Sequence, residues 1–419
     1  MRPEQTNESP RQPRGPDRKW LRRWLKQSSR PGAWITALLI GFAAAFTLLT
    51  LALPKKDFSE RENRKLADPP KLTLSALADG SFADGAEHWF ADHFFSRDFW
   101  VRSLLRERTL LGLRENGGVW LGKKGSLFLI PQTPDEDNLT RTLAAMDGFA
   151  AANGTIRTFV SVVPNAFTVQ PDRLPAFAPA PDQTEQLRRV AEALPHATFL
   201  DVTEALKAKS GESLYYRTDH HWTSLGAYTA FAAMAPGLGI AAPVTDYEIH
   251  PVSVSFYGTL ASKSGRFRSP DTVEIWLPRT DVQYTVTYPD TKKKTATLYD
   301  REALKEKDQY LVFFGGNHPR VDIATTAETG RHLLLIKDSY ANCMVQFLYP
   351  YFDEIVMIDP RYYYDNAAPL LARHGITDIL YLYNCDTFLN DASIADLLGT
   401  IEVPAEPAAD AAPGAAEVG

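Results

Sequence analysis

The pattern of apolar and polar residues along the chain changes at Leu53. The 21 residues Ala33–Leu53 carry no charge, and as one helix they would cross about 30 Å of hydrocarbon. After this run, short apolar stretches rich in β-branched residues alternate with amphipathic stretches. We therefore predict one apolar helix followed by a large folded region.

The folded region shows strand and helix patterns in alternation. Apolar runs predict strands at Thr158–Val163, Thr198–Val202, Leu333–Ile336, Ile355–Ile358 and Ile379–Tyr383. Helical spacing predicts helices at Arg97–Leu113, Thr184–Leu194, Tyr340–Leu348 and Ala367–Arg373, and one more that begins after an N-cap at Thr223. Such alternation is typical of an α/β fold with a mostly parallel sheet.

Two further segments have strand character alone. Gly118–Ile130 alternates around a Lys-Lys-Gly turn, which predicts a β-hairpin. From about 249 to 322 the chain is rich in Tyr, Val and Thr, and we expect a β-rich insertion in the α/β fold. Phe256 and Tyr257 in this insertion are candidates to stack on sugar rings.

The charge distribution predicts the orientation of the apolar helix. Met1–Arg30 holds nine Lys or Arg and three Asp or Glu, a net charge of +6, whereas the whole chain carries −6 and the remainder therefore −12. Basic residues before an apolar helix keep the N-terminus in the cytoplasm, so everything after Leu53 is expected outside it. The alternative is a cleaved signal peptide. However, the apolar run is longer than the apolar region of a typical signal peptide, and no small-residue cleavage site follows it.

Composition narrows the choice of function. With 44% hydrophobic and 23% charged residues, most of the chain is expected to fold. Its acidic major part excludes nucleic acid as an expected partner, because nucleic-acid binding needs a basic surface. The two cysteines, Cys343 and Cys385, are isolated, and we expect small buried side chains instead of a disulfide.

These observations predict five regions. They are a cytoplasmic basic tail over 1–32, a transmembrane signal-anchor over 33–53, a tether over 54–89, an ectodomain over 90–402 and a disordered acidic tail over 403–419. The β-rich insertion belongs to the ectodomain.

The first candidate site is the segment YYRTDHHW, which ends at Trp222. In an extended segment, Asp219 and His221 share a side, and His220 points elsewhere. The carboxylate then holds one imidazole nitrogen and orients the other. Three interpretations compete: a catalytic acid–base pair, which we favour, a structural Asp–His hydrogen bond, and a metal site of all three residues. The further Asp-rich motifs of manganese phosphoesterases are not found.

The second candidate site is the segment LLLIKDSYAN, in which an apolar strand leads directly into a helix. This places Ser339 at the carboxyl edge of the sheet, where α/β proteins have their sites. The helix N-terminus supplies N–H donors and a positive dipole that suit a developing oxyanion. Alternatively, Ser339 or Asp338 only caps the helix. With Asp219 and His221, Ser339 completes a Ser–His–Asp set.

Other residues are candidates for an oxyanion site or for substrate binding. In FFGGNHP the glycines let the backbone approach a ligand, and Asn317 beside Gly316 offers an amide donor; a plain turn is the alternative. Asn165 follows a predicted strand at the same edge of the sheet and is a further candidate for substrate binding. The alternative is that it only belongs to the turn that terminates the strand. Arg217 and Tyr340, which lie next to the two catalytic elements in sequence, complete this set.

These residues resemble those of the DHHW proteins, which belong with the AlgX/AlgJ-type SGNH-hydrolase-like domains of polysaccharide O-acetylation. The resemblance covers about Phe58–Asn390 and rests on YYRTDHHWTSLGAY, FSERENRKL, FADHFFSRDFW, GVWLGKKGSLF, FYGTLASKSG, LLLIKDSYAN and IVMIDPRYY. It implies an SGNH-hydrolase-like (flavodoxin-like) fold in which Asp219 orients His221, His221 is the base and Ser339 is the nucleophile. His220 stands where the alginate proteins usually have Thr.

The resemblance also implies a function and a partner. It implies a membrane-anchored, extracytoplasmic O-acetyltransferase that acts on a cell-surface polysaccharide, with no cofactor and no metal. Because acetyl-CoA is not available outside the cytoplasm, the acetyl group is expected from a multi-spanning membrane O-acyltransferase. A polysaccharide acetyl esterase with the same triad is one alternative, and a non-catalytic glycan-binding or assembly subunit is another.

Overall fold

The computed structural model describes residues 30–399, so most of the predicted basic tail and all of the predicted acidic tail lie outside the described residues. The described chain divides into two compact units. The first holds the residues up to Ser59 together with Arg64–Ser103, and the second holds Glu60–Asn63 and everything from Leu104 onward.

The first unit contains α2 (Arg30–Ala52), the helix predicted from the uncharged run. Its segment Gly32–Ala52 has a mean hydropathy of 2.2 and is long and apolar enough to cross a membrane. The segment expected to be a tether carries short elements, namely β1 (Phe58–Ser59), β2 (Arg64–Lys65), α3 (Leu74–Ala78) and α4 (Ser81–His93). Helix α5 (Arg97–Leu110) lies where a helix was predicted.

The second unit is built on an eight-stranded sheet with the order β11-β10-β12-β14-β13-β15-β6-β7. Its parallel half contains β14 (Glu354–Ile358), β13 (His332–Lys337), β15 (Asp378–Asn384), β6 (Arg157–Val163) and β7 (Thr198–Phe199). All five coincide with predicted strands, because apolar runs mark strands that are largely buried in a parallel sheet. The mostly parallel α/β fold is therefore confirmed.

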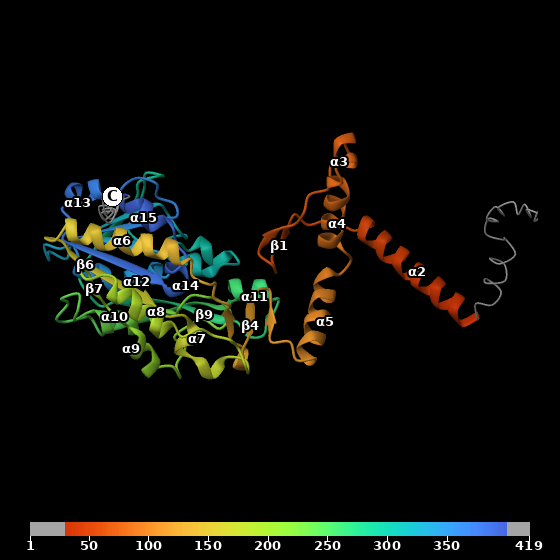
Figure 1. Cartoon of the computed structure of the whole chain (residues 1–419), viewed down its shortest axis with the longest axis horizontal. Coiled ribbons are helices and arrows are strands. Elements are labelled where there is room, and N and C mark those ends of the chain that lie inside the picture. Colours follow the sequence, from red (N-terminus) through yellow and green to blue (C-terminus); the bar gives the residue numbers. More distant parts are fainter. Residues whose placement is uncertain (1–29, 400–419) are drawn as a thin grey trace, which may run out of the picture. The chain divides into compact units, whose positions relative to one another are not determined.

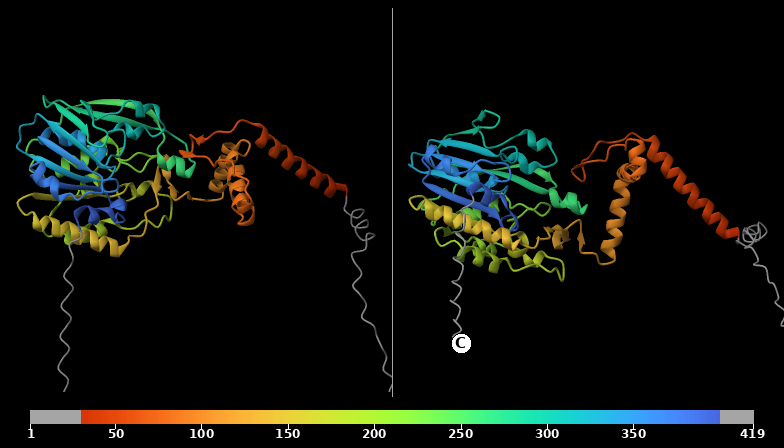
Figure 2. Two further views of the ribbon diagram at one scale, coloured as in Figure 1. Left: turned by 90° about the horizontal axis from the view of Figure 1, so that it is seen from above. Right: turned by 45° about the horizontal axis from the view of Figure 1, so that its top comes forward.

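Helices cover both faces of this sheet. One face packs against α6 (Glu136–Ala152), α8 (Gln183–Glu192), α13 (Ala368–Arg373) and α15 (Ser393–Leu398). The other packs against α9 (Thr203–Ala208), α10 (Ser224–Met234) and α12 (Ala341–Leu348). Figure 1 shows α6 and α15 on one side of the strands and α10 on the other, and Figure 2 shows α6 running along the sheet. The sheet is thus the middle of three layers.

The β-rich segment is partly an extension of the main sheet. Strands β10 (Tyr284–Tyr288), β11 (Lys293–Thr295) and β12 (Arg320–Thr325) add an antiparallel half next to β14. Only β8 (Tyr247–Phe256) and β9 (Asp271–Pro278) form a separate antiparallel pair. The predicted hairpin is present as β4 (Val119–Leu121) and β5 (Leu127–Leu129), with β3 (Glu115–Asn116) beside it.

Two local predictions are also confirmed. The side chain of Thr223 accepts a hydrogen bond from the backbone N–H of Gly226 and so caps α10. Cys343 and Cys385 are both buried, and neither forms a disulfide. Helix α6, in contrast, was not predicted, and it supplies part of the core on its face of the sheet.

Candidate active site

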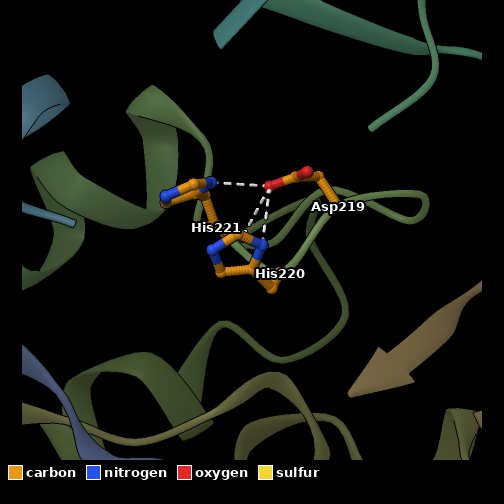
Figure 3. A group of neighbouring side chains, drawn as sticks. All are labelled: Asp219, His220 and His221. Atoms are coloured by element: carbon orange, nitrogen blue, oxygen red, sulfur yellow. Dashed lines mark hydrogen bonds and ion pairs between the residues drawn. The ribbon is translucent and has the colours of Figure 1, made fainter. Parts of the chain in front are cut away.

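The segment that contains Asp219 is a tight loop and not the extended strand that we expected. Tyr215 and Trp222 form an isolated antiparallel bridge that closes this loop. The two-residue alternation therefore fails, and the prediction that His220 points elsewhere is wrong, because its Nδ1 lies 3.5 Å from Asp219 Oδ1. The rings of His220 and His221 both turn toward the same carboxylate (Figure 3), with their centroids 3.9 Å apart.

Asp219 nevertheless contacts His221 as predicted. Its Oδ1 lies 2.6 Å from Nδ1 of His221 and accepts the backbone N–H of the same residue at 3.0 Å. Its Oδ2 accepts the backbone N–H and the hydroxyl of Thr259, at 2.7 and 3.0 Å. Thr259 is the first residue of α11 (Thr259–Ser264). The Asp219 side chain is only 1% exposed, so four donors hold one buried carboxylate in a fixed orientation.

Ser339 faces the other side of the imidazole. It follows β13 directly, and its Oγ lies 2.7 Å from Nε2 of His221. The N-terminus of α12 has no side-chain cap. Asp338 instead fixes the turn before the helix, because its carboxylate accepts the backbone N–H of Tyr340 at 2.9 Å and that of Asn384 at 2.9 Å. The hydroxyl of Ser339 is therefore free of a capping role. Ser339, His221 and Asp219 form one continuous hydrogen-bonded chain.

Asn317 is held beside the start of α12 by a buried lysine. Nζ of Lys337 donates to Asn342 Oδ1 at 2.9 Å and to Asn317 Oδ1 at 3.4 Å. Asn342 Nδ2 also donates to Asn317 Oδ1, at 3.1 Å. Burial lowers the pKa of Lys337, and the nearby Asp359 opposes that shift. Because two donors engage the Asn317 oxygen, its amide nitrogen remains as a donor for a ligand.

The turn before Asn317 departs from ordinary backbone geometry. Phe314, Gly315 and Gly316 have φ values of +66°, +76° and +118°. Left-handed conformation in a non-glycine residue such as Phe314 is energetically costly and is found mainly at functional sites. Gly316 also accepts a hydrogen bond from Asn342 Nδ2 at 3.5 Å through its carbonyl. The predicted Gly316–Asn317 element thus lies against the helix that Ser339 precedes.

The other expected substrate-binding residues are engaged by the protein itself. Tyr340 is buried, and its hydroxyl donates to the carbonyl oxygen of His220. Arg217 pairs with Asp271 at 3.2 Å. The amide of Asn165 is occupied by Gln183 and Asn384, at 2.7 and 3.2 Å. Their direct roles in substrate binding stay predictions.

The aromatic pair suggested for sugar stacking requires a correction. Phe256 is fully buried, and its ring packs edge-on against Tyr216 at a centroid distance of 5.3 Å. A side chain inside the core offers no face to a sugar, so that expectation is wrong for Phe256. The ring of Tyr257 contacts Phe267 at 5.3 Å.

Tyr310 belongs to the site and was missed by the sequence analysis. It lies in the short 3-10 helix η4 (Gln309–Val312). Its ring stacks on His221 with a centroid distance of 3.8 Å and an interplanar angle of 13°. Its hydroxyl donates to the backbone carbonyl of Ser339 at 2.9 Å. One buried side chain therefore contacts both the base and the nucleophile of the predicted triad.

The charges of the loop favour an ionised Asp219. Burial alone would raise the pKa of Asp219, but the electrostatic interaction with the adjacent imidazoles of His220 and His221 and the hydrogen bond from His221 outweigh it and hold that pKa well below its usual range. Burial, followed by the charge of His221, lowers the pKa of His220. Asp219 is thus a carboxylate and His220 a neutral imidazole at physiological pH.

The metal alternative keeps a geometric basis. One ligand atom each from Asp219, His220 and His221 lie within 4.8 Å of one another. However, both ring nitrogens of His221 already contact partners, Asp219 on one side and Ser339 on the other. A metal bound by His221 would have to displace one of them.

Part of the chain matches a known protein family. Residues 197–358 match the family model described as DHHW protein. The predicted DHHW resemblance is confirmed. The matched segment contains Asp219, His221, Asn317 and Ser339. No match was found among curated proteins.

Several solved structures are similar to this chain. A DHHW family protein from Eubacterium siraeum has a TM-score of 0.59 and 24% identity, over 67% of this chain and 95% of that one. Bacillus cereus PatB1 with a sulfonyl adduct has a TM-score of 0.57 and 17% identity, over 65% and 96%. The O-acetyltransferase domain of Pseudomonas putida AlgJ has a TM-score of 0.43 and 17% identity, over 67% and 98%. The first two confirm the predicted fold class.

The hydrogen bond between Asp219 and His221 has a spectroscopic signature. A short, buried bond to a carboxylate strongly deshields the proton it carries, so the His221 Hδ1 should resonate far downfield in proton NMR. Asp219→Asn should abolish this signal. Gly258→Ala should also abolish it, because the new Cβ would lie 2.3 Å from Asp219 Oδ2.

Two variants serve as controls for this experiment. His220→Ala should keep the downfield signal, since it leaves Asp219 and His221 in place. Gly154→Ala should keep it too, because a Cβ there meets only the carbonyl of Ala151, at 3.8 Å. A signal that survives Asp219→Asn would contradict the proposed hydrogen bond.

Proposed function

We propose that this chain is a membrane-anchored, extracytoplasmic O-acetyltransferase that acetylates a cell-surface polysaccharide. The observation that carries the proposal is the chain of two hydrogen bonds from Ser339 Oγ to His221 Nε2, at 2.7 Å, and from His221 Nδ1 to Asp219, at 2.6 Å. A hydroxyl, an imidazole and a carboxylate in this order activate a nucleophile. The DHHW match supports the same chemistry.

The first half of the reaction loads the enzyme. Ser339 Oγ attacks the carbonyl carbon of an acetyl ester while His221 Nε2 takes the hydroxyl proton. Asp219 stabilises the resulting imidazolium and fixes its orientation. The carbonyl oxygen gains negative charge, which the N-terminus of α12 and the amide of Asn317 stabilise. The ester oxygen leaves with the proton from His221, and the acetyl group stays on Ser339.

The second half transfers the acetyl group to the glycan. A sugar hydroxyl attacks the acetyl carbonyl carbon while His221 removes its proton. The bond to Ser339 Oγ then breaks, and the serine recovers that proton from His221. The acetyl donor is proposed to be supplied by a multi-spanning membrane O-acyltransferase, because the chemistry takes place outside the cytoplasm. No cofactor enters either half.

The alternative function is a polysaccharide acetyl esterase with water as the acceptor. The triad is the same, so the two functions differ only in the molecule that resolves the acyl-enzyme. PatB1 was solved with a sulfonyl adduct. Sulfonyl groups attach to activated nucleophiles, and the same class of reagent is a useful probe for Ser339 here.

Loss of any triad member should nearly abolish turnover of an activated acetyl ester by the purified full-length protein. We expect Ser339→Ala, His221→Ala and Asp219→Ala each to lower kcat by a factor on the order of 10³ or more, because the three act as one unit. The triple variant should be little worse than Ser339→Ala. Mass spectrometry should locate a sulfonyl fluoride label on Ser339.

Two comparisons control this measurement. His220→Ala should be much milder, since His220 is not part of the chain of hydrogen bonds. Chelation by EDTA should leave turnover unchanged. If EDTA abolishes turnover and Ser339→Ala does not, the metal interpretation replaces the triad.

In cells, Ser339→Ala should lower the acetate content of the surface polysaccharide, measured after alkaline release. A transferase adds acetyl groups, so its loss removes them, whereas loss of an esterase would increase them. A rise in glycan acetate would therefore favour the esterase. An unchanged acetate content together with unchanged ester turnover would favour a non-catalytic subunit.

The location proposed for the active site can be tested on intact cells with the wall removed. Helix α2 is apolar enough to span a membrane, and the basic residues before it favour a cytoplasmic N-terminus. Added protease should digest the chain beyond Leu53 and leave a short N-terminal fragment in the membrane. A C-terminal epitope tag that survives this treatment would contradict the proposed orientation.

A further inference from the structure

A second polar site lies at the same edge of the sheet as Ser339. Strand β13 is flanked by β14 and β15, and all three are parallel. Ile336 pairs with Ile358, and Lys337 pairs with Leu382. If this pairing is continued past the end of β13, Ser339 is level with Arg361 on the β14 side and with Asn384 on the β15 side.

Both neighbouring strands lead into one pocket. It has a volume of about 300 Å³, and its polar lining residues are Gln132, Arg361, Asp386, Thr387, Asn390 and Asp391. Arg361 follows β14, and Asp386 and Thr387 follow β15. Since β13 lies between these strands, the pocket and Ser339 lie at the same carboxyl edge of the sheet. Carboxyl ends of parallel strands are where α/β folds bind their ligands.

The pocket contains an acceptor with no partner. Asp391 is 8% exposed, and its Oδ1 accepts the backbone N–H and the hydroxyl of Ser393, at 2.8 and 2.5 Å. Its Oδ2 is buried and has no hydrogen-bond partner in the described part of the chain. The same is true of Nδ2 of Asn384 and the hydroxyl of Tyr383 at the end of β15. Buried polar atoms are rarely left unpaired, so the free oxygen of the pocket-lining Asp391 indicates a polar ligand.

The charge of the pocket selects the class of ligand. The guanidinium of Arg361 is already paired with the buried Asp359, through Nε at 2.8 Å and Nη2 at 2.6 Å. Asp386 and Asp391 add two carboxyl groups without a further lysine or arginine in the lining. An anionic ligand would be repelled, whereas an uncharged molecule with several hydroxyl groups can donate to the carboxyl groups and accept from the amides.

We propose that this pocket is an acceptor subsite that binds an uncharged sugar residue of the polysaccharide and so presents a neighbouring hydroxyl to the acetylated Ser339. The inference rests on the proposed transferase function. It adds the location of the subsite and the class of sugar. Asp391 accepts a hydrogen bond from one sugar hydroxyl, and Thr387 and Asn390 supply further polar contacts.

Binding is tested first, without turnover. Full-length protein in detergent, carrying Ser339→Ala, is titrated by calorimetry with neutral glucose, galactose and mannose oligosaccharides and with uronic acid oligosaccharides of equal length. At least one neutral oligosaccharide should bind, and more tightly than the uronic acid ones. Thr387→Val and Asp391→Asn should each weaken its binding about tenfold, as expected for one hydrogen bond.

A matched control comes from another polar pocket on the same unit. Thr184 lines a pocket of about 400 Å³ at the start of α8, remote in the sheet order from β13. Thr184→Val makes the same chemical change as Thr387→Val and should leave binding unchanged. Thermal melting of each variant confirms that it folds.

Transfer is tested second, with Ser339 restored and an activated acetyl ester as donor. Thr387→Val should raise the KM for the neutral oligosaccharide about tenfold with a smaller effect on kcat, as loss of a binding contact does. If no neutral oligosaccharide binds, or if Thr387→Val binds as Thr184→Val does, the subsite is refuted. If the variants bind as expected but no acetylated sugar forms, the result supports the subsite and contradicts the transferase function.

Discussion

The site depends on one buried carboxylate. Asp219 is removed from water and is stable there because two donors on His221 and two on Thr259 satisfy its oxygens. An unpaired buried charge would cost several kcal/mol, so these contacts are mutually dependent. The loop closed by Tyr215 and Trp222 and the start of α11 are consequently fixed relative to each other. The orientation of the imidazole follows from this arrangement.

The second constraint is the register of the sheet, which brings Ser339 to that imidazole. Strand β13 lies between β14 and β15 in the parallel half; it ends at Lys337, and Asp338 and Ser339 follow in succession. Each has a different task. Lys337 ties Asn317 to α12, Asp338 fixes the turn, and only the Ser339 hydroxyl faces His221. Tyr310 contacts both residues: its ring stacks on His221, and its hydroxyl donates to the backbone carbonyl of Ser339.

The sequence was sufficient for the parts that depend on local pattern and on chemical type. The five parallel strands follow from their apolar runs, and Asp219, His221 and Ser339 follow from chemistry that needs those side chains. The sequence was insufficient where tertiary contacts determine the position of a side chain. The position of His220 depends on the Tyr215–Trp222 bridge, which no local pattern indicates. Tyr310 carries no motif, and its role exists only because η4 packs against the loop. Phe256 was expected at the surface, although its ring fills the core beside Tyr216.

The difference between transfer and hydrolysis must therefore come from outside the triad. In the proposed mechanism, water and a sugar hydroxyl attack the same acyl-enzyme with the same base, and the triad geometry does not distinguish them. A transferase gains its advantage by holding the acceptor close, because a positioned hydroxyl reacts with a high effective concentration. We propose that two features at the carboxyl edge of the sheet provide such positioning: the Asn317 amide near the helix start, and the polar pocket that Arg361 and Asp391 line. On this proposal, the strands that flank β13 would set the choice of acceptor.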